Sequence, residues 1–231
     1  MRPHRLLTAL MPVLILGPLA TATTLTAQDP TADEKAKQRF ESLLTAAKKQ
    51  PEKADWKALR HAFAETTDYQ PYNPAWRSAL TKVMGQLDSG DAKEAEAALI
   101  KLLDREGYMR LDAHSLAVLL YKKTGEKEKE EMHRQFIEGI SSTLFVPGAG
   151  QSFEKPIEVL FIEEEYLLLG ALKVKAKRQG LQEHDGHRFD VYNTEPKEGE
   201  APRTFYFNVD LLQNALARML RAAKEAPPEK P

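Results

Sequence analysis

The spacing of apolar residues changes once along the chain, and this change constrains the fold more than any other feature. From residue 29 to about residue 144, apolar side chains recur every three to four positions, which is the period of an amphipathic helix. Pro147 and Gly148 then interrupt the pattern, and short apolar runs with the length of strands follow. We therefore predict an α+β fold, with a helical region at residues 28–145 and a small sheet region at residues 146–224.

Capping and breaking residues divide the first region into six helices. Pro51 ends the first helix, Asp55 and Asp91 stand where N-cap residues belong, and Gly125 is a natural C-cap. The segments GDAKEAE, which starts at Gly90, and GEKEKEE, which starts at Gly125, both open a helix. Their separation is close to the ~34-residue period of tetratricopeptide repeats. We therefore expect a short, tetratricopeptide-like stack of antiparallel helical hairpins.

Strand-like and turn-like segments alternate in the second region. The apolar run Ile157–Ile162 and the segment Arg203–Val209 are predicted strands, and GLQEHDGHRFDVYN predicts a hairpin that turns at Asp185 and Gly186. The segment Glu163–Leu172 fits either a strand or a helix, and its acidic start favours the helix because the helix dipole attracts negative charge. The region is thus expected to form a small antiparallel sheet with one or two helices.

Residues 1–27 have the pattern of a secretory signal peptide. Arg2 and Arg5 give a basic start, Leu6–Leu19 is apolar and uncharged, and small residues follow at possible cleavage positions. An uncleaved anchor is the alternative, but the apolar run is shorter than the ~20 residues that span a membrane. We expect an exported protein, periplasmic or extracellular, from a Gram-negative bacterium, with a disordered tail at residues 225–231.

Charge and composition exclude several classes of function. The 33 basic and 34 acidic residues give a net charge of −1, so no overall field attracts nucleic acid or acidic lipid. The chain has no cysteine, which excludes disulfides, thiolate metal sites and a cysteine nucleophile. We therefore expect no nucleic-acid partner, no cofactor, and no stable membrane span once the signal peptide is removed.

Five short motifs occur in an order that resembles a known family. They are FAETTDYQPY (Phe63–Tyr72), GAGQS (Gly148–Ser152), EEEYLLLGAL (Glu163–Leu172), RQGL (Arg178–Leu181) and FYFNV (Phe205–Val209). Their order is similar to that in an uncharacterised bacterial family, domain of unknown function 4919. Ala149 and Gln151 depart from the polar residue and the lysine that the family carries in its glycine turn. The resemblance implies an exported bacterial protein and assigns no reaction.

Three aromatic residues form one candidate binding site. Tyr69, Tyr72 and Trp76 surround Asn73 and Pro74, which suit the cap and the first position of a helix. The aromatic side chains either fill the gap between two helical hairpins or line a groove for a peptide or ligand. The first interpretation is the simpler one, and the second makes these residues candidate ligand contacts.

The glutamates Glu163, Glu164 and Glu165 are the other candidate binding residues. They offer carboxylates for acid–base chemistry, but adjacent residues of a helix point in different directions, so all three cannot converge. A solvated helix start is the preferred interpretation. Ser152 does not complete a nucleophile elbow, because Glu154 stands where the second glycine of the motif belongs.

The predicted hairpin makes His184 and His187 a weak candidate for a metal site. The register places these two histidines opposite each other and places Glu183 opposite Arg188. A metal site needs a third ligand, and Asp185 is committed to the turn, so we expect no metal to bind. The preceding segment KVKAKR either binds an anionic surface or protects a sheet edge from pairing, and edge protection is preferred.

These observations favour a non-enzymatic, exported scaffold or binding protein that engages a protein or peptide partner in the cell envelope. The alternative is a small hydrolase or a metal-binding protein with a site between the helical and sheet regions. A hydrolase requires one of the three glutamates to meet Ser152, His184 or His187 in a common cleft.

Overall fold

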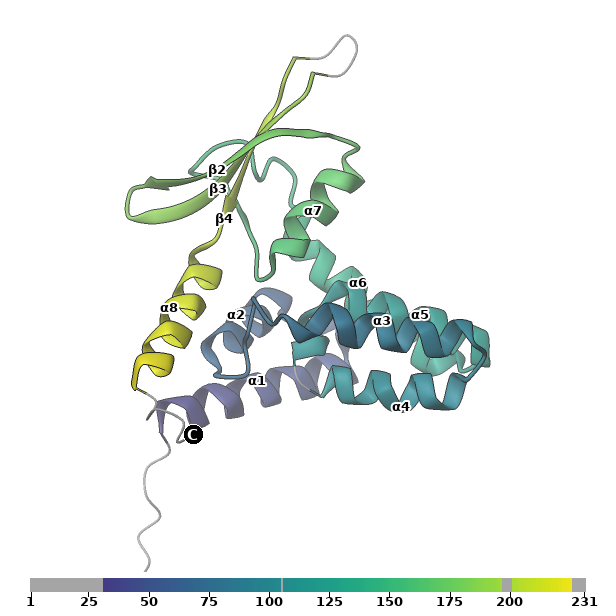
Figure 1. Cartoon of the computed structure of the whole chain (residues 1–231). Coiled ribbons are helices and arrows are strands. Elements are labelled where there is room, and N and C mark those ends of the chain that lie inside the picture. The colour runs from purple at the N-terminus through teal and green to yellow at the C-terminus, as the bar shows by residue number, and fades with distance from the viewer. Residues whose placement is uncertain (1–30, 105, 197–200, 226–231) are drawn as a thin grey trace, which may run out of the picture.

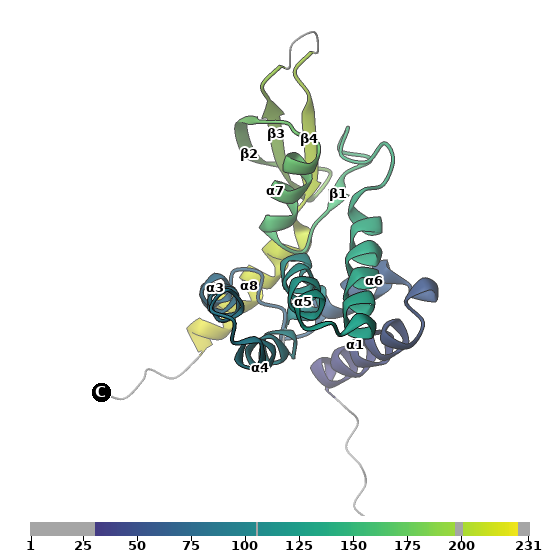
Figure 2. The same ribbon diagram turned by 90° about the vertical axis from the view of Figure 1, so that its right-hand side faces the viewer.

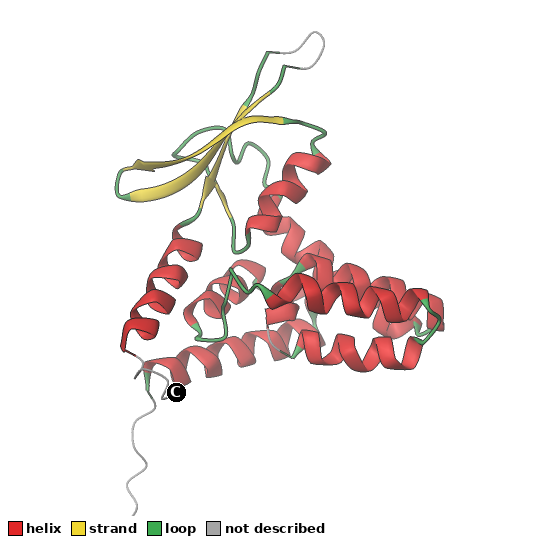
Figure 3. Ribbon diagram, in the orientation of Figure 1, coloured by secondary structure: helices red, strands yellow, loops and turns green. Residues whose placement is uncertain are grey.

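The computed structural model describes residues 31–104, 106–196 and 201–225. The predicted signal peptide and residues 226–231 of the predicted tail lie outside these ranges. Helices and a single sheet make up the described part, which confirms the α+β class (Figures 1 and 3). We call residues 31–145 the helical half and residues 146–225 the sheet half.

All six helices predicted for the helical half are present. Their bounds are α1 (Ala32–Lys49), α2 (Trp56–Glu65), α3 (Ala75–Asp88), α4 (Ala92–Leu103), α5 (Leu111–Thr124) and α6 (Lys127–Leu144), with short 3₁₀ turns at Pro51–Lys53 and Glu106–Met109. The caps predicted at Asp55, Asp91 and Gly125 are confirmed: the backbone N–H of Ala58 donates to Asp55, that of Glu94 donates to Asp91, and Gly125 has a φ of 80°. The cap predicted at Asn73 is one residue out, because Pro74 is the N-cap residue of α3.

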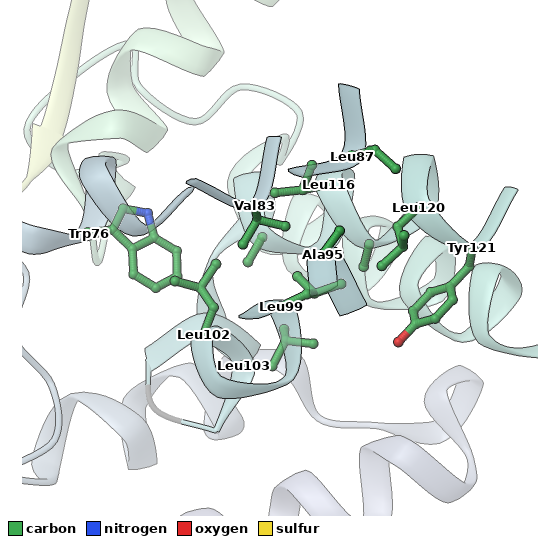
Figure 4. Close-up of a cluster of buried hydrophobic side chains, with 12 residues drawn as sticks. Trp76, Val83, Leu87, Ala95, Leu99, Leu102, Leu103, Leu116, Leu120 and Tyr121 are labelled. Carbon is green, nitrogen blue, oxygen red and sulfur yellow. The ribbon is translucent and has the colours of Figure 1, made fainter. Parts of the chain in front are cut away.

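Two hydrophobic clusters hold the helices together. The first joins α3, α4 and α5 through Val83, Leu99 and Leu120, which Figure 4 shows between the three helices. The second joins α1, α2 and α6 through Phe63 and Phe136 and also takes in Leu160, Phe161 and Ala215 of the sheet half. The two halves therefore share a core. The tetratricopeptide-like character of the stack stays a prediction.

The sheet has four strands in the order β1-β4-β3-β2 (Figure 2). Their bounds are β1 (Ile157–Glu158), β2 (Ala176–His184), β3 (His187–Thr194) and β4 (Thr204–Asn208). The β2–β3 and β3–β4 pairs are antiparallel as predicted, but β1 pairs with β4 in parallel, so the sheet is mixed. The hairpin prediction is confirmed, with Asp185 and Gly186 at φ 49° and 78° and with Glu183 opposite Arg188.

The strand predicted at Ile157–Ile162 is wrong beyond its second residue. The backbone of Leu160 turns out of the sheet, because its N–H donates to the Glu164 carboxylate and its carbonyl accepts from the Tyr69 hydroxyl. Phe161 then becomes the N-cap residue of α7 (Ile162–Ala171), so the helix predicted over the three glutamates is confirmed. Leu168 and Leu169 of α7 pack into the same cluster as Phe207 of the sheet.

The last helix, α8 (Asp210–Glu225), follows β4 directly. Leu212 is buried in the cluster that contains Leu168 and Phe207, and Ala215 is buried in the cluster that contains Phe63 and Phe136. Arg218 donates to the carbonyl of Ala64 at the end of α2. No helix in residues 31–104, 106–196 and 201–225 is long and apolar enough to cross a membrane.

Candidate functional site

A buried ion pair joins the helical half to the sheet half. The Arg60 guanidinium of α2 donates to both carboxylate oxygens of Glu164 of α7, with N–O distances of 2.6 and 3.0 Å. Both side chains are almost completely buried, and Glu164 also accepts from the N–H of Leu160 at 2.8 Å. The predicted solvated helix start is therefore wrong for Glu164 and Glu165, because α7 packs its first turn against α2 and against Tyr192 of β3 rather than against water.

Tyr69 lies beside this ion pair and is buried. Its hydroxyl donates to the carbonyl of Leu160, and its ring packs edge-on against Phe63 and Phe161, with centroids 5.4 and 5.8 Å away. Burial and the nearby Glu164 carboxylate raise the pKa of the Tyr69 hydroxyl. In these contacts Tyr69 fills the gap beneath α7, and its side chain is not presented to solvent.

Glu165, one residue further along α7, and Asp190 of β3 form a second buried group. The Tyr192 hydroxyl donates to Glu165 Oε2 at 2.8 Å, whereas Glu165 Oε1 is buried and has no hydrogen-bond partner. Burial raises the pKa of Glu165 to about 8, with a contribution from the nearby Asp190. Asp190 accepts from Gln179 at 3.2 Å, and burial raises its pKa as well. The neutral form of the Glu165 carboxyl group is thus favoured by its surroundings.

Tyr72 is exposed and lies within electrostatic reach of the same carboxyl groups. Its pKa is raised by burial of part of the ring and by the charges of Asp190 and Glu165. The loop that carries Tyr72 therefore extends toward Glu165 of α7 and Asp190 of β3. Asp190 was not predicted; its signal in the sequence is a carboxylate between the apolar residues Phe189 and Val191 of a strand.

Arg110 organises a third polar group around Trp76. Its guanidinium carbon lies 4.3 Å from the centroid of the Trp76 ring and 3.8 Å from that of Phe161, in cation–π contact with both. Glu106 and Glu163 approach the same guanidinium at 3.4 and 3.5 Å. Trp76 itself is 6% exposed, so most of its surface is committed to packing.

The structure does not bring the hydrolase candidates together. The three glutamates contact Arg60, Arg110, Tyr192 and the backbone of Leu160, while Ser152 lies in the turn that precedes β1. Glu163 and Glu164 thus pair with arginines of the helical half, whereas Glu165 contacts Tyr192 within the sheet half.

His184 and His187 lie opposite each other in the hairpin register but make separate contacts. The His184 ring stacks on Phe153 with centroids 4.4 Å apart, and His187 Nδ1 lies 2.6 Å from the Asp210 carboxylate. Across the part of the chain that the structure describes, no group of three or more histidine, aspartate or glutamate side chains is placed to hold a metal ion.

A cavity lies between the two halves, and we call it the hinge groove. It has a volume of about 600 Å³ and is open to solvent. Its walls come from the start of α2, the end of α6 and the loop that leads into β1, in particular Trp56, Ser142, Val146, Lys155 and Glu158. No motif in the sequence indicates this groove, because its walls come from three segments that are separated along the chain.

Two close approaches shape the walls of the hinge groove. Trp56 lies against the backbone of α6 at Gly139, where a β-carbon would stand 1.9 Å from the Trp56 ring. Gly150 has a φ of 77°, and a β-carbon there would stand 2.6 Å from Ile157. Glycine is therefore required at both positions, one beneath the tryptophan and one within the turn.

The rim of the hinge groove carries a histidine–carboxylate pair. Glu158 Oε1 lies 2.6 Å from His61 Nε2, and both side chains are about one-third exposed. The Ser142 and Thr143 hydroxyls donate to the carbonyls of Gly139 and Ile140, so both are held by the end of their own helix. A smaller cavity of about 330 Å³ lies between α3 and α4 and is lined partly by Trp76.

No family model, no curated protein and no solved structure matches the chain. The resemblance to the family of domain of unknown function 4919 therefore stays a prediction, and so does export from a Gram-negative cell.

Proposed function

We propose that the protein is a non-enzymatic binding protein that holds a short peptide segment of a partner in the hinge groove. The observation that carries the proposal is the position of this cavity of about 600 Å³, between the helical half and the loop into β1. Sites for small ligands commonly lie at such junctions and have volumes of roughly 300–1,000 Å³.

The lining of the hinge groove suits a peptide. Trp56, Val146 and Ile157 offer apolar contact, and the indole ring suits the side chain of an anchor residue. Lys57 and Lys155 stand among acidic residues of the same lining, so charged groups of both signs surround the apolar surface. A peptide presents apolar side chains and polar amides together, which matches this mixture.

The packing of the groove supports binding more than catalysis. Trp56 is fixed against Gly139 and meets the Phe136 ring edge-on, with centroids 5.0 Å apart. A wall that is already ordered loses little conformational freedom when a ligand binds, which favours affinity. The serine and threonine hydroxyls of the lining are engaged by carbonyls of α6 and are not activated by a base.

One observation favours hydrolysis at the same groove as a second candidate function. The His61–Glu158 pair at 2.6 Å has the arrangement in which a carboxylate orients an imidazole as a general base. A peptidase or esterase assay of wild-type protein and of His61→Ala tests this alternative. Activity that disappears in the variant would support it, and inactivity of both proteins with bound peptides left intact would exclude it.

Peptide binding is tested by selection followed by titration. Peptides selected from a random displayed library against the full chain are synthesised and titrated into Trp76→Phe protein, in which Trp56 is the one remaining tryptophan of the two in the chain. A change in Trp56 fluorescence that saturates supports the groove as the site. Binding that leaves Trp56 emission unchanged would place the peptide elsewhere.

A further inference from the structure

The outer edge of the sheet is the most exposed regular element of the described chain. β2 forms one margin of the sheet, with β3 on its inner side and no strand on its outer side among the described residues (Figure 2). Every residue of β2 except His184 is exposed, so neither face of the strand is covered. An uncovered edge strand carries backbone N–H and C=O groups that are free to pair with another chain.

Charge is distributed unevenly along this edge. Lys173, Lys175, Lys177 and Arg178 lie at the start of β2 and just before it, whereas Glu183 and Asp185 lie at its end and in the turn. The strand is thus basic at one end and acidic at the other. Edge lysines discourage pairing with neutral or basic strands, but a strand that is charged in this way is complementary to its own reversed copy.

The centre of β2 is suited to close approach. Gly180 stands midway between Ala176 and His184, and the space that a side chain would occupy there is open. The next residue, Leu181, is 57% exposed, a large apolar side chain left in water beside that glycine. A second strand at this edge would cover the leucine and meet no side chain at the glycine.

We propose that a second copy of this chain pairs with β2 in antiparallel orientation, with the two-fold axis at Gly180. In this register Lys177 stands opposite Glu183 of the second copy. This opposite-charge contact occurs twice, because the arrangement is symmetric. The two four-stranded sheets then form one continuous sheet across the axis.

The register follows from elementary sheet geometry. In an antiparallel pair centred on Gly180, Gln179 faces Leu181 of the second copy, and the two Leu181 side chains become diagonal neighbours at roughly 7–8 Å, within reach of each other. A parallel pair of the same strands would instead align lysine with lysine. The antiparallel arrangement is therefore the one that both charge and apolar contact favour.

The hydrogen-bonded pairing between the two copies of β2 is short, because the structure of β2 limits it at both ends. The register of β2 against β3 shifts between Ala176 and Arg178, and the turn at Asp185 and Gly186 ends the strand. The bulge disrupts pairing locally, although β2 and β3 pair again at Ala176 and Thr194, and the tight turn ends the strand. The dimer is therefore expected to be reversible and dependent on concentration, and its surface is separate from the hinge groove, which lies by β1 at the other margin.

Sedimentation equilibrium with charge-reversal variants tests the dimer. Wild-type protein is expected to associate as a monomer–dimer pair, and Lys177→Glu or Glu183→Lys alone is expected to weaken association about 10-fold or more, because each reversal puts two like-charge contacts in the dimer. An equimolar mixture of the two variants restores both opposite-charge contacts and is expected to dimerise at the wild-type concentration. Lys93→Glu, on the exposed surface of α4, is the matched control and should leave association unchanged.

Hydrogen exchange locates the contact, and circular dichroism confirms that each variant is folded. The amides of residues 178–183 should become more protected as protein concentration rises, while the amides of β1 should not change. Wild-type protein that stays monomeric up to its solubility limit would overturn the proposal. A dimer that neither charge reversal weakens, or that the mixture of variants does not restore, would overturn it as well.

Discussion

Arg60 and Glu164 are 104 residues apart in the sequence, and their side chains meet through two hydrogen bonds of 2.6 and 3.0 Å inside the protein. The pair ties α2 to the first turn of α7, and the N–H of Leu160 completes the coordination of the carboxylate. This pair thereby fixes the position of the helical half relative to the sheet half, and residues of both halves line the hinge groove.

Removal of Arg60 is expected to destabilise the protein strongly. Arg60→Met leaves the buried Glu164 carboxylate without its cation, and breaking a buried pair in this way costs roughly 3–5 kcal/mol. The free energy of unfolding in urea measures the effect. Arg39→Ala breaks the exposed pair with Glu65 and should cost at most about 1 kcal/mol. Equal losses in the two variants would contradict the structural role of the buried pair.

Glu165 is expected to make the protein less stable at alkaline pH. The folded protein retains the Glu165 proton up to a pKa of about 8, above the ordinary value of 4.5, so the folded state binds the additional proton between these values. The contribution of Glu165 to the free energy of unfolding is fully present below about pH 4.5 and is lost as pH rises through about 8. Glu165→Gln keeps the neutral group, so its unfolding free energy should stay flat from pH 6 to 9 while that of the wild type falls. Glu163→Gln, at an exposed position, should behave as the wild type.

The buried pair His114 and His133 is expected to make the protein sensitive to acid. Their Nδ1 atoms lie 2.7 Å apart, and burial lowers the pKa of His114 to about 3 and that of His133 to about 4. The unfolded chain therefore binds more protons than the folded protein below about pH 6.5. The stabilisation that comes from keeping the two histidines neutral is present above this pH and is lost as pH falls toward 4. Denaturation midpoints between pH 7 and 4 measure the loss.

The same pair has defined tautomers. His114 Nε2 donates its hydrogen to the carbonyl of Tyr108, so His114 Nδ1 accepts from the Nδ1–H of His133. Nitrogen chemical shifts should report these two tautomers, unchanged from pH 7 to 5. A ring that titrates with a midpoint near 6.5 would contradict the arrangement.

Gly139→Ala is expected to disturb the wall of the hinge groove. The new β-carbon would stand 1.9 Å from the Trp56 ring, so the ring must move, and such overpacking costs roughly 1–3 kcal/mol. Gly85→Ala is the matched control, because it lies in α3 with open space around it and should stabilise the helix by about 0.5–1 kcal/mol. Urea unfolding separates the two, and Trp56 emission in the Trp76→Phe background reports displacement of the ring. Unchanged emission and stability in Gly139→Ala would contradict the close contact.

The sequence predicts the local features of this fold well, because short-range physics determines them. The caps at Asp55 and Gly125 and the turn at Asp185 and Gly186 each depend on residues within a few positions. The parallel pairing of β1 depends instead on β4, which lies far along the chain, and no local pattern specifies it.

The junction between the halves illustrates why the candidate site could be predicted only in part. An arginine in an amphipathic helix is typical of an exposed face, so Arg60 gives no sign of its buried partner. Tyr69 and Trp76 are buried, but Tyr69 packs against Leu160 and Phe161 of the sheet half, whereas Tyr72 extends toward Asp190 and Glu165. The hinge groove depends on Trp56 meeting Gly139, a contact between segments that are distant in sequence.

The most direct test of peptide binding in the hinge groove is a titration that obstructs the groove. A selected peptide is titrated into Trp76→Phe protein and into the same protein with Ser142→Phe, which places a ring in the groove wall, or with Ser78→Phe, which places one on an exposed position of α3. We predict that Ser142→Phe weakens binding about 10-fold or more, equivalent to about 1.4 kcal/mol, and that Ser78→Phe leaves it unchanged. Equal affinity for all three proteins would contradict the proposed function.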